Sequence, residues 1–328
     1  MSNQEPRPDV HECPAEQGEP PQVELFAPRD VPLGGPRAMT VRRTIPHRQR
    51  TLIGAWCFLD HYGPDDVADT GGMVVPRHPH TGLQTASWLF TGEIEHKDSA
   101  GFEALVRPGE LYLMTAGRGI SHSEFSTRET SILHGVQLWI ALPDRSRHTA
   151  PTLQHHVPDL VAGEGWTARV FLGSLLGSTS PVETHTPLVG AELLLEAGAR
   201  LEIEVDESFE HGVLPDDGTL VVDGTETEAA ALAFVPRGRR RITIEAGETP
   251  VRAILIGGEP LGEHLLMWWN FVGRSHDEIV EYRDAWMREI GEDWVPGGEE
   301  RYGPFPEGEP DPLPAPVLPN VRMKPRPR

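Results

Sequence analysis

Short runs of alternating apolar and polar residues, separated by turns that contain Gly and Pro, constrain the fold of this chain most. Residues 84–90 and 133–142 each fit a strand. Between them, Arg107-Pro108-Gly109-Glu110 has Pro and Gly at the central positions of a type II turn, and residues 111–114 follow as another strand. The 34 Gly and 32 Pro among 328 residues favour many turns over long helices. Short strands at this spacing predict a β-sandwich or a small barrel.

Two stretches before this block carry local signals of their own. Residues 52–59 are apolar without alternation, which predicts a strand buried on both faces. Tyr62-Gly63-Pro64-Asp65-Asp66 has the composition of a turn, so we expect the chain to reverse there.

The second half of the chain repeats the pattern of the first with different residues. Residues 198–205 alternate, and two Asp-Gly pairs, Asp217-Gly218 and Asp223-Gly224, are typical of hairpin turns. Val235-Pro236-Arg237-Gly238 resembles the Pro-Gly turn of the first half. We therefore predict a mainly β chain that contains an internal duplication of one barrel.

Composition sets the expected segment boundaries. Residues 1–22 are rich in Glu, Pro and Gln and predict a disordered N-terminal tail. The first barrel is expected in residues 23–150, and the second barrel with a short helix in residues 151–300. Residues 301–328 are Pro-rich and predict an extended polyproline-type tail, disordered unless it binds a partner.

The helix is predicted over residues 275–290. Ser275 is followed three residues later by Glu278, which is the capping-box pattern at a helix N-terminus. Four apolar residues then recur at spacings of three and four, on one face of the helix: Ile279, Tyr282, Trp286 and Ile290. This face is expected to pack on a barrel.

Two pairs of candidate metal ligands lie in predicted strands. His78 and His80 stand in Arg77-His78-Pro79-His80-Thr81-Gly82, and His122 and Glu124 in a second Gly-flanked stretch. Residues i and i+2 of a strand point to the same face, so each pair can face one cavity. Three imidazoles and one carboxylate suit a divalent transition metal. The ligand set accepts iron, manganese, nickel, copper and zinc, so these residues alone leave the metal open.

A plainer interpretation stands beside the metal site. A His can also be a buried, hydrogen-bonded residue or a surface residue without a ligand. This interpretation could explain a single H-x-H pair, but it explains two paired motifs less well. The barrel copy in the second half contains His185 and His211 but, outside the predicted helix, no H-x-H and no H-x-E sequence. We therefore expect a metal in the first barrel and none in the second.

Charge and cysteine content limit the function classes. A net charge of -21 opposes binding to phosphate backbones and anionic lipid, which argues against nucleic-acid and membrane partners but leaves a protein partner open. Two cysteines, Cys13 and Cys57, imply no disulfide framework and suit a reducing compartment. No basic region followed by an apolar stretch stands at the N-terminus, and the apolar residues 265–269 are too few to span a bilayer. A cytoplasmic protein is expected.

Several blocks of this sequence resemble the pirin family of bicupin metalloproteins. The blocks are His78-Pro79-His80-Thr81-Gly82, Gly92-Glu93-Ile94-Glu95-His96-Lys97-Asp98-Ser99, Arg107-Pro108-Gly109-Glu110 and Met114-Thr115-Ala116-Gly117-Arg118-Gly119-Ile120-Ser121-His122-Ser123-Glu124. The similarity is highly specific over residues 76–125 and looser over residues 43–143. It returns at residues 256–261 and in the helix from Ser275.

The resemblance implies two cupin barrels, each a double-stranded β-helix, with one divalent metal in the first barrel only. The family metal is usually iron, which makes Fe(II) the first choice here. The positions that match the family ligands are those selected by spacing: His78, His80, His122 and Glu124. Two positions beside them differ, since Thr81 stands where many relatives have a basic residue and Gln84 where many have Glu.

Family members are quercetin 2,3-dioxygenases or regulatory partners of other proteins, so two hypotheses follow. In the first, the chain is a metal-dependent dioxygenase that opens the flavonol ring of quercetin, with Glu124 as metal ligand and general base. In the second, it is a non-enzymatic, metal-binding regulatory protein that contacts a partner protein. A metal-dependent isomerase or another dioxygenase is a minor third alternative. Quercetin turnover under air by the iron-loaded protein separates the first two.

Overall fold

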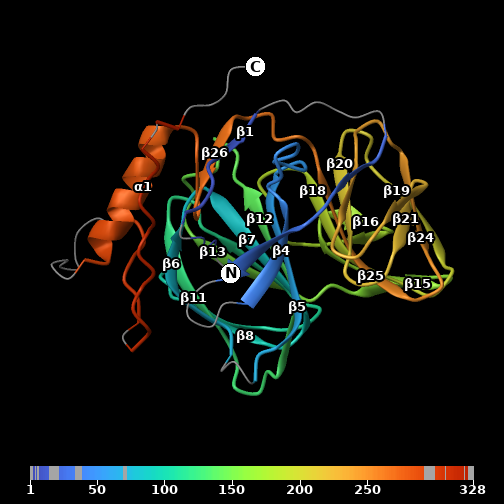
Figure 1. The fold of residues 1–328 in the computed structure, drawn as a ribbon, viewed down its shortest axis with the longest axis horizontal. Helices are drawn as coiled ribbons and strands as arrows, with labels where there is room; N and C mark the ends of the chain where they lie inside the picture. The colour runs from blue at the N-terminus through green and yellow to red at the C-terminus, as the bar shows by residue number, and fades with distance from the viewer. Residues whose placement is uncertain are drawn as a thin grey trace.

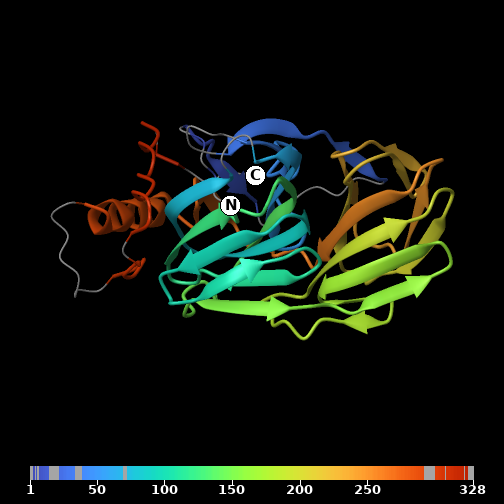
Figure 2. The same ribbon diagram turned by 90° about the horizontal axis from the view of Figure 1, so that it is seen from below.

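The computed structural model describes residues 3, 5, 7–14, 22–33, 39–68, 72–291, 300–306, 308–320 and 322–323, and most of its regular structure is β-strand (Figure 1). Two barrels lie side by side, and the one α-helix among the described residues, α1 (His276–Glu289), lies at the end of the molecule away from the second barrel (Figure 2). The prediction of a mainly β chain with two barrels in tandem is confirmed.

The first barrel combines a seven-stranded and a four-stranded antiparallel sheet. The larger sheet has the order β13 (Thr152–His156), β10 (Leu111–Thr115), β7 (Leu83–Thr91), β12 (Ile132–Ala141), β5 (Trp56–Asp66), β4 (Met39–Ile45) and β3 (Arg29–Leu33). The smaller sheet has the order β6 (Val74–His80), β11 (Ile120–Ser126), β8 (Ile94–Asp98) and β9 (Glu103–Val106). A buried cluster joins the two sheets, with Val41 and Tyr62 from the larger and Val75 and Ile94 from the smaller.

The second barrel repeats this arrangement. Its seven-stranded sheet has the order β14 (Leu160–Gly163), β15 (Trp166–Leu172), β18 (Leu188–Leu195), β25 (Val251–Gly258), β20 (Glu210–Pro215), β23 (Leu232–Val235) and β2 (Glu24–Phe26). Its four-stranded sheet has the order β19 (Arg200–Glu204), β24 (Arg241–Ala246), β21 (Leu220–Val222) and β22 (Thr225–Thr227). A hairpin of β16 (Ser174–Leu175) and β17 (Ser178–Thr179) adjoins them. The recurring seven-plus-four pattern supports the inferred duplication.

The two barrels share one apolar core. Trp88 of the first barrel stacks on Phe171 of the second, with ring centroids 4.7 Å apart. The indole nitrogen of Trp56 donates across the interface to the carbonyl oxygen of Gly257 at 3.0 Å. Because this core is continuous, burial of apolar surface holds the barrels together as it holds each barrel closed.

N-terminal segments cross between the barrels. Strand β2 precedes the first barrel in sequence but pairs with β23 of the second. Strand β1 (His11–Cys13) pairs with β26 (Leu265–Trp268), which in turn pairs with β27 (Phe271–Gly273). The predicted disorder of residues 1–22 is therefore wrong for the part that the structure describes, because main-chain pairing and burial of Cys13 hold it in place. Residues 15–21 lie outside the described residues.

The turn predicted at residues 62–66 is also wrong, because β5 continues through Asp66. The strand bulges instead: its pairing with β12 shifts between Leu133 and Gly135. Gly63 has a φ of 79°, and a Cβ there would lie 2.2 Å from the carbonyl oxygen of Leu133. Gly and Pro therefore mark a bulge here, where Pro64 sits outside the regular ladder.

Helix α1 confirms the prediction over residues 275–290, with Ser275 as N-cap and Ile290 as C-cap. The Ser275 hydroxyl accepts a hydrogen bond from the Glu278 amide at 3.2 Å. Tyr282 and Trp286 are buried on the face that packs beside β26 and β27. No helix among the described residues combines the length and the apolar character needed to cross a membrane.

The described part of the Pro-rich C-terminal segment is packed on the protein. Tyr302 is fully buried, and the amide of Leu313 donates to the carbonyl oxygen of Arg77 at 2.8 Å. The indole nitrogen of Trp286 donates to the carbonyl oxygen of Leu313, also at 2.8 Å. The predicted disordered tail is therefore wrong for these residues, while residues 324–328 lie outside the described part.

Candidate metal centre

The two strands that carry the paired ligand motifs are neighbours. Strands β6 and β11 run antiparallel, and His78 lies directly opposite His122. His80 follows two residues after His78 on β6, so its side chain leaves the same face of the sheet. The spacing argument placed each pair on a strand, and the strand assignment is confirmed.

Three imidazoles converge on one buried point. The ring centroids of His78 and His122 are 4.3 Å apart, and His80 lies 5.0 Å from each of them. One nitrogen of each ring lies within 4.8 Å of the others, and all three side chains are fully buried. Three nitrogens at this spacing form a candidate divalent metal site.

Hydrogen bonds leave lone pairs available at this point. The Nδ1 atom of His78 lies 2.9 Å from the carbonyl oxygen of Pro76, which can only accept, so Nδ1 carries the proton and Nε2 keeps its lone pair. The ring of His80 has one backbone contact, with Asn270, and leaves a nitrogen without a partner. Nε2 of His122 has no hydrogen-bond partner among the described residues. Buried polar atoms without partners are costly in a folded protein, and a bound metal removes that cost.

A second His-acid pair sets the proton position on His122. The Asp98 carboxylate accepts from the amides of Ala100 and Phe102 at 2.9 and 3.0 Å, and it lies 3.2 Å from Nε2 of His96. The carboxylate can only accept, so Nε2 of His96 carries a proton and donates it in a hydrogen bond to Asp98. Nδ1 of His96 is then free of a proton and accepts a hydrogen bond from Nδ1 of His122 at 3.3 Å. The Nε2 lone pair of His122 therefore faces the cluster.

His96 and Asp98 were missed as site residues by the spacing argument. They form an H-x-D pair on β8, with the same two-residue spacing that identified the H-x-H pair. Strand β8 pairs with β11, and there Asp98 lies opposite His122 and His96 opposite Glu124. The spacing was therefore a usable signal, but the pairing of the two strands was not visible in it.

Glu124 lies beside the imidazole cluster in an overlapping group. Its carboxylate belongs with His96 and His122, whose candidate ligand atoms also lie within 4.8 Å of one another. The pairing of β11 with β6 shifts between His122 and Glu124, so Glu124 lies opposite Val75. The structure thus groups His78, His80 and His122 together, and links Glu124 to them through His122.

Burial sets the charges of these groups. It lowers the pKa of His78 to about 3 and the pKa values of His80 and His122 well below their usual value. These imidazoles are therefore neutral at neutral pH, as metal ligands must be. Burial alone would raise the pKa of Glu124, but neighbouring positive charge holds it below its usual value. Glu124 is an anion beside neutral imidazoles.

The two positions that depart from the family pattern have separate partners. The hydroxyl of Thr81 lies 3.1 Å from the hydroxyl of Tyr302 in the C-terminal segment. The amide nitrogen of Gln84 donates to the hydroxyl of Thr115 at 2.9 Å. Both side chains are fully buried and neutral. Neither adds a charge to the surroundings of the cluster.

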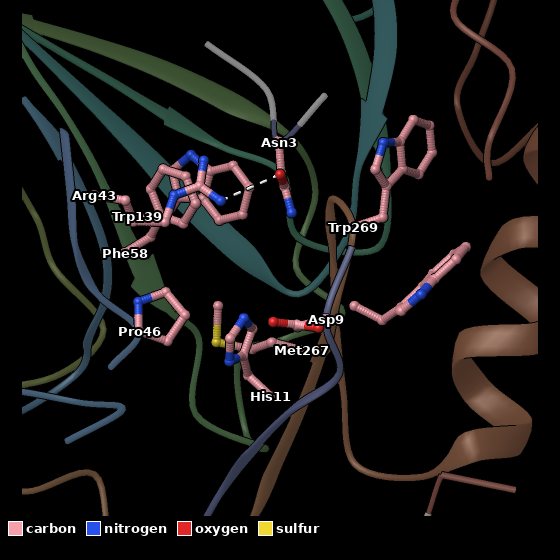
Figure 3. Close-up of a pocket in the computed structure, with 10 residues that line it drawn as sticks. Asn3, Asp9, His11, Arg43, Pro46, Phe58, Trp139, Met267 and Trp269 are labelled. Carbon is pink, nitrogen blue, oxygen red and sulfur yellow. Dashed lines mark hydrogen bonds between the residues drawn. The ribbon is translucent and has the colours of Figure 1, made fainter. Parts of the chain in front are cut away.

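A small pocket adjoins the centre through an aromatic wall (Figure 3). Trp139 approaches the ring of His80 edge-on, with centroids 5.1 Å apart, and its other side stacks on Phe58 at 4.0 Å. The pocket is also lined by Arg43 and by residues of the N-terminal segment, among them Asn3. Only about 10 Å³ remains open to a water molecule, so the pocket is almost filled by protein.

Another cluster joins the two barrels, formed by His61, His134 and Asp216. Nε2 of each His lies 2.6 Å from the same Asp216 carboxylate oxygen. The Nε atom of Arg42 donates to Nδ1 of His61 at 3.1 Å, which places the His61 proton on Nε2, toward Asp216. A bound cation would displace that proton beside a guanidinium, so the cluster suits a hydrogen-bonded link better than a metal. Among the described residues, no metal-type group forms around His185 or His211.

Comparisons with known proteins agree with this architecture. The family model for Pirin matches residues 38–140, and the model for the Pirin C-terminal cupin domain matches residues 190–290. A Pseudomonas aeruginosa protein named "Putative quercetin 2,3-dioxygenase" is 39% identical over 97% of this chain and 98% of its own length. A Pirin-like protein of Caulobacter vibrioides is 35% identical over 75% of this chain and 87% of its own.

A solved structure extends the similarity to three dimensions. The crystal structure of quercetin 2,3-dioxygenase from Acinetobacter baumannii has a TM-score of 0.85 and 38% sequence identity. The match covers 93% of this chain and 98% of that one. Both barrels therefore have the cupin fold.

Proposed function

The chain belongs to the pirin family, and on this premise we propose that it is a metal-dependent dioxygenase that opens the flavonol ring of quercetin. Two similar proteins carry the name quercetin 2,3-dioxygenase, which supports the substrate class. The fold alone would not, because cupin-type barrels serve unrelated functions.

One observation carries the proposal: buried imidazole nitrogens without partners face a common point. A structural His normally has both ring nitrogens hydrogen-bonded when it is buried. Here His80 leaves at least one ring nitrogen without a partner, and His78 and His122 each leave Nε2 unpaired, among the described residues. The bonds that do exist, from His78 to Pro76 and from His122 to His96, set the tautomers that metal binding needs.

We assign the metal to His78, His80 and His122, with Glu124 as fourth ligand. When bound, a divalent transition metal such as Fe(II) supplies Lewis acidity and redox chemistry toward dioxygen. The donor set, three nitrogens and one carboxylate, is also compatible with manganese, nickel, copper or zinc.

Glu124 is the residue placed to move a proton. Its carboxylate is buried and anionic, whereas the three imidazole lone pairs would be used to hold the metal. As the flavonol binds, the O–H bond of its hydroxyl group breaks and the proton passes to a carboxylate oxygen of Glu124. His96 lies opposite Glu124 and is bonded to Asp98, so a polar chain continues from the base into the protein.

The remaining residues around the centre exclude water and orient the substrate. Trp139 meets the His80 ring edge-on and stacks on Phe58, and both aromatic rings line the pocket beside the centre, where a flavonol ring would find aromatic neighbours. Stacking holds the ring while its hydroxyl faces Glu124, and the dry surroundings strengthen that contact.

Oxygen uptake tests this function. The purified chain is stripped of metal, reloaded in turn with Fe(II), Mn, Ni, Cu and Zn, and given quercetin under air. Quercetin-dependent oxygen uptake is expected with at least one metal and none in the stripped protein. No uptake by any fully loaded form would remove the quercetinase assignment, and the regulatory hypothesis would then be the better one.

A further inference from the structure

The N-terminal strap, defined here as the described residues Asn3, Glu5 and 7–14, covers the pocket beside the metal centre. Asn3 is only 5% exposed although it is polar. Its amide donates to the side-chain oxygen of Asn270 at 2.8 Å, in the turn between β26 and β27. Further along, β1 pairs with β26, where His11 lies opposite Met267. The strap is thus held near both of its ends by the β26–β27 hairpin.

Beneath the strap lies a buried guanidinium with one nitrogen directed at the pocket. Arg43 holds Asp60 through two parallel bonds, from Nε at 2.7 Å and Nη2 at 2.8 Å. Its remaining nitrogen, Nη1, donates to the side-chain oxygen of Asn3 at 3.2 Å (Figure 3). It also donates to the Glu5 carboxylate at 3.1 Å. Among the described residues, both acceptors of Nη1 come from the strap.

The walls around that nitrogen are flat and aromatic. The Arg43 guanidinium lies over the ring of Phe58, 4.1 Å from its centroid. Phe58 stacks on Trp139 with an interplanar angle of 11°, and Trp139 meets His80. A buried cation that covers one face of an aromatic stack and directs a donor into the pocket matches a planar aromatic molecule that carries an acceptor oxygen. The strap fills this space, since room for about one water remains.

We propose that Arg43, Phe58 and Trp139 form a substrate subsite for a planar aromatic ligand with a phenolate or carboxylate oxygen, and that the strap occupies it in the resting protein. The oxygens of Asn3 and Glu5 stand in for the ligand oxygen at Arg43. The ligand enters when the strap lifts, and Arg43 keeps its hold on Asp60 throughout. This inference rests on the proposed function for the identity of the ligand, for which quercetin is the probe.

A reversible lock on the strap tests whether it must lift. His11 and Met267 lie directly opposite each other on neighbouring strands, a position that suits a disulfide. The double variant His11→Cys, Met267→Cys is compared in its oxidised and reduced forms, with His11→Cys alone as control. Quercetin binding is followed by quenching of tryptophan fluorescence, and access to the metal by its rate of removal with pyridine-2,6-dicarboxylate. We expect both to fall at least tenfold on oxidation and to recover on reduction. Equal binding and equal removal in the two forms would overturn the proposal.

Removing the strap oxygens tests their competition with the ligand. In the double variant Asn3→Ala, Glu5→Ala the Nη1 donor of Arg43 loses both strap acceptors, so quercetin should bind about tenfold more tightly. Arg7→Ala is the matched control, because Arg7 is exposed and lies in the same segment. An unchanged affinity in the double variant would overturn the competition.

The role of Arg43 is tested with Arg43→Lys, which keeps a cation beside Asp60 but removes the directed Nη1 donor. The unsubstituted flavone ring system has no hydroxyl oxygen to offer, so the wild type should prefer quercetin to flavone by about tenfold or more. The variant should lose that preference and keep its affinity for flavone. Retention of the preference would overturn the subsite.

These outcomes separate the inference from the proposed function. If quercetin binding is weaker in the oxidised than in the reduced double Cys variant but no metal-loaded form takes up oxygen, the dioxygenase assignment fails and the strap inference stands. If oxygen uptake is the same in the oxidised and reduced double Cys variant, the inference fails and the enzyme assignment stands.

Discussion

His96 and His122 face each other through their Nδ1 atoms at 3.3 Å, so the contact is a hydrogen bond only when one of the two carries a proton there. Asp98 determines which of the two rings donates, because its carboxylate accepts a hydrogen bond from Nε2 of His96. His122 therefore donates, and its Nε2 lone pair is directed to the cluster with His78 and His80. A metal ligand is thus oriented from the neighbouring strand β8.

Asp98→Asn should weaken metal binding without removing a ligand. The amide can donate as well as accept, so the proton order along His96 and His122 is no longer enforced. Loss of such an outer partner typically costs about 10–100-fold in metal affinity. The dissociation constant is measured by competition with a chelator, with the exposed Asp217→Asn as control. Equal affinities in the variant and the control would refute the proton order.

His80→Ala should remove most of the bound metal and leave the fold intact. No side chain among the described residues depends on His80 for a hydrogen bond, and the apolar cores supply most of the stability. Metal content is measured on purified protein, together with the circular dichroism spectrum of the metal-free form. His264→Ala, on the surface, is the control. Full metal occupancy in the His80 variant would disprove the ligand assignment.

Glu124→Gln separates the ligand role from the base role. The amide keeps one ligating oxygen, so three imidazoles still hold some metal, but the negative charge and the proton acceptor are lost. Quercetin-dependent oxygen uptake should fall by about 10²–10⁴-fold, far more than metal content. Both are measured on the same preparations. Full activity at full occupancy would mean that Glu124 is not the base, even if the chain is a dioxygenase.

Metal binding should saturate at one equivalent per chain. The second barrel has no paired ligands near His185 or His211, and the interbarrel cluster at Asp216 is already occupied by N–H donors. Metal is counted after gel filtration of untagged protein, in the wild type and in His134→Ala. A second equivalent that disappears in His134→Ala would show that the interbarrel cluster binds metal after all.

Stability should decline as the pH falls from 7 toward 4. Burial lowers the pKa of His211 to about 4, so the folded state keeps this ring neutral while the unfolded chain binds a proton below a pH of about 6.5. The stabilisation is complete above the unfolded pKa and is lost as the pH falls toward the folded pKa. At pH 5 the loss is about 2 kcal/mol for one such group. His11, lowered to about 4 by burial, adds to it.

Denaturant unfolding at several pH values measures this slope. His211→Gln should flatten the decline, because Gln does not titrate, while the exposed His264→Gln should leave it unchanged. An identical slope in the two variants would show that His211 does not stay neutral in the folded state.

Local spacing predicted which candidate ligands share a strand because strand geometry is local. Two residues on one strand share a face whatever the strand pairs with, so His78 with His80, and His122 with Glu124, followed from the period of the backbone. The helix followed in the same way from its Ser275 cap and its apolar face.

Contacts between distant segments could not be derived from local pattern. Asn3 contacts Arg43, 40 positions away, and Asn270, 267 positions away. Nothing in the polar, Pro-rich sequence around Asn3 indicates either contact. The composition of residues 1–22 therefore favoured disorder, although the strap is buried. His96 was missed because its role depends on β8 lying beside β11, and Gly63-Pro64 was taken for a turn because a bulge has the same composition.

The exchange of N-terminal strands also fixes an order of events on the ribosome. The partners of β1 and β2 are β26 and β23, which end at Trp268 and Val235. At a synthesis rate of about 5–20 residues per second, these partners emerge many seconds after the N-terminal strands. Strands β1 and β2 of the nascent chain therefore have no strand partner until most of the second barrel has been synthesised. The N-terminal strap can therefore close over the pocket beside the metal centre only late in synthesis of the chain.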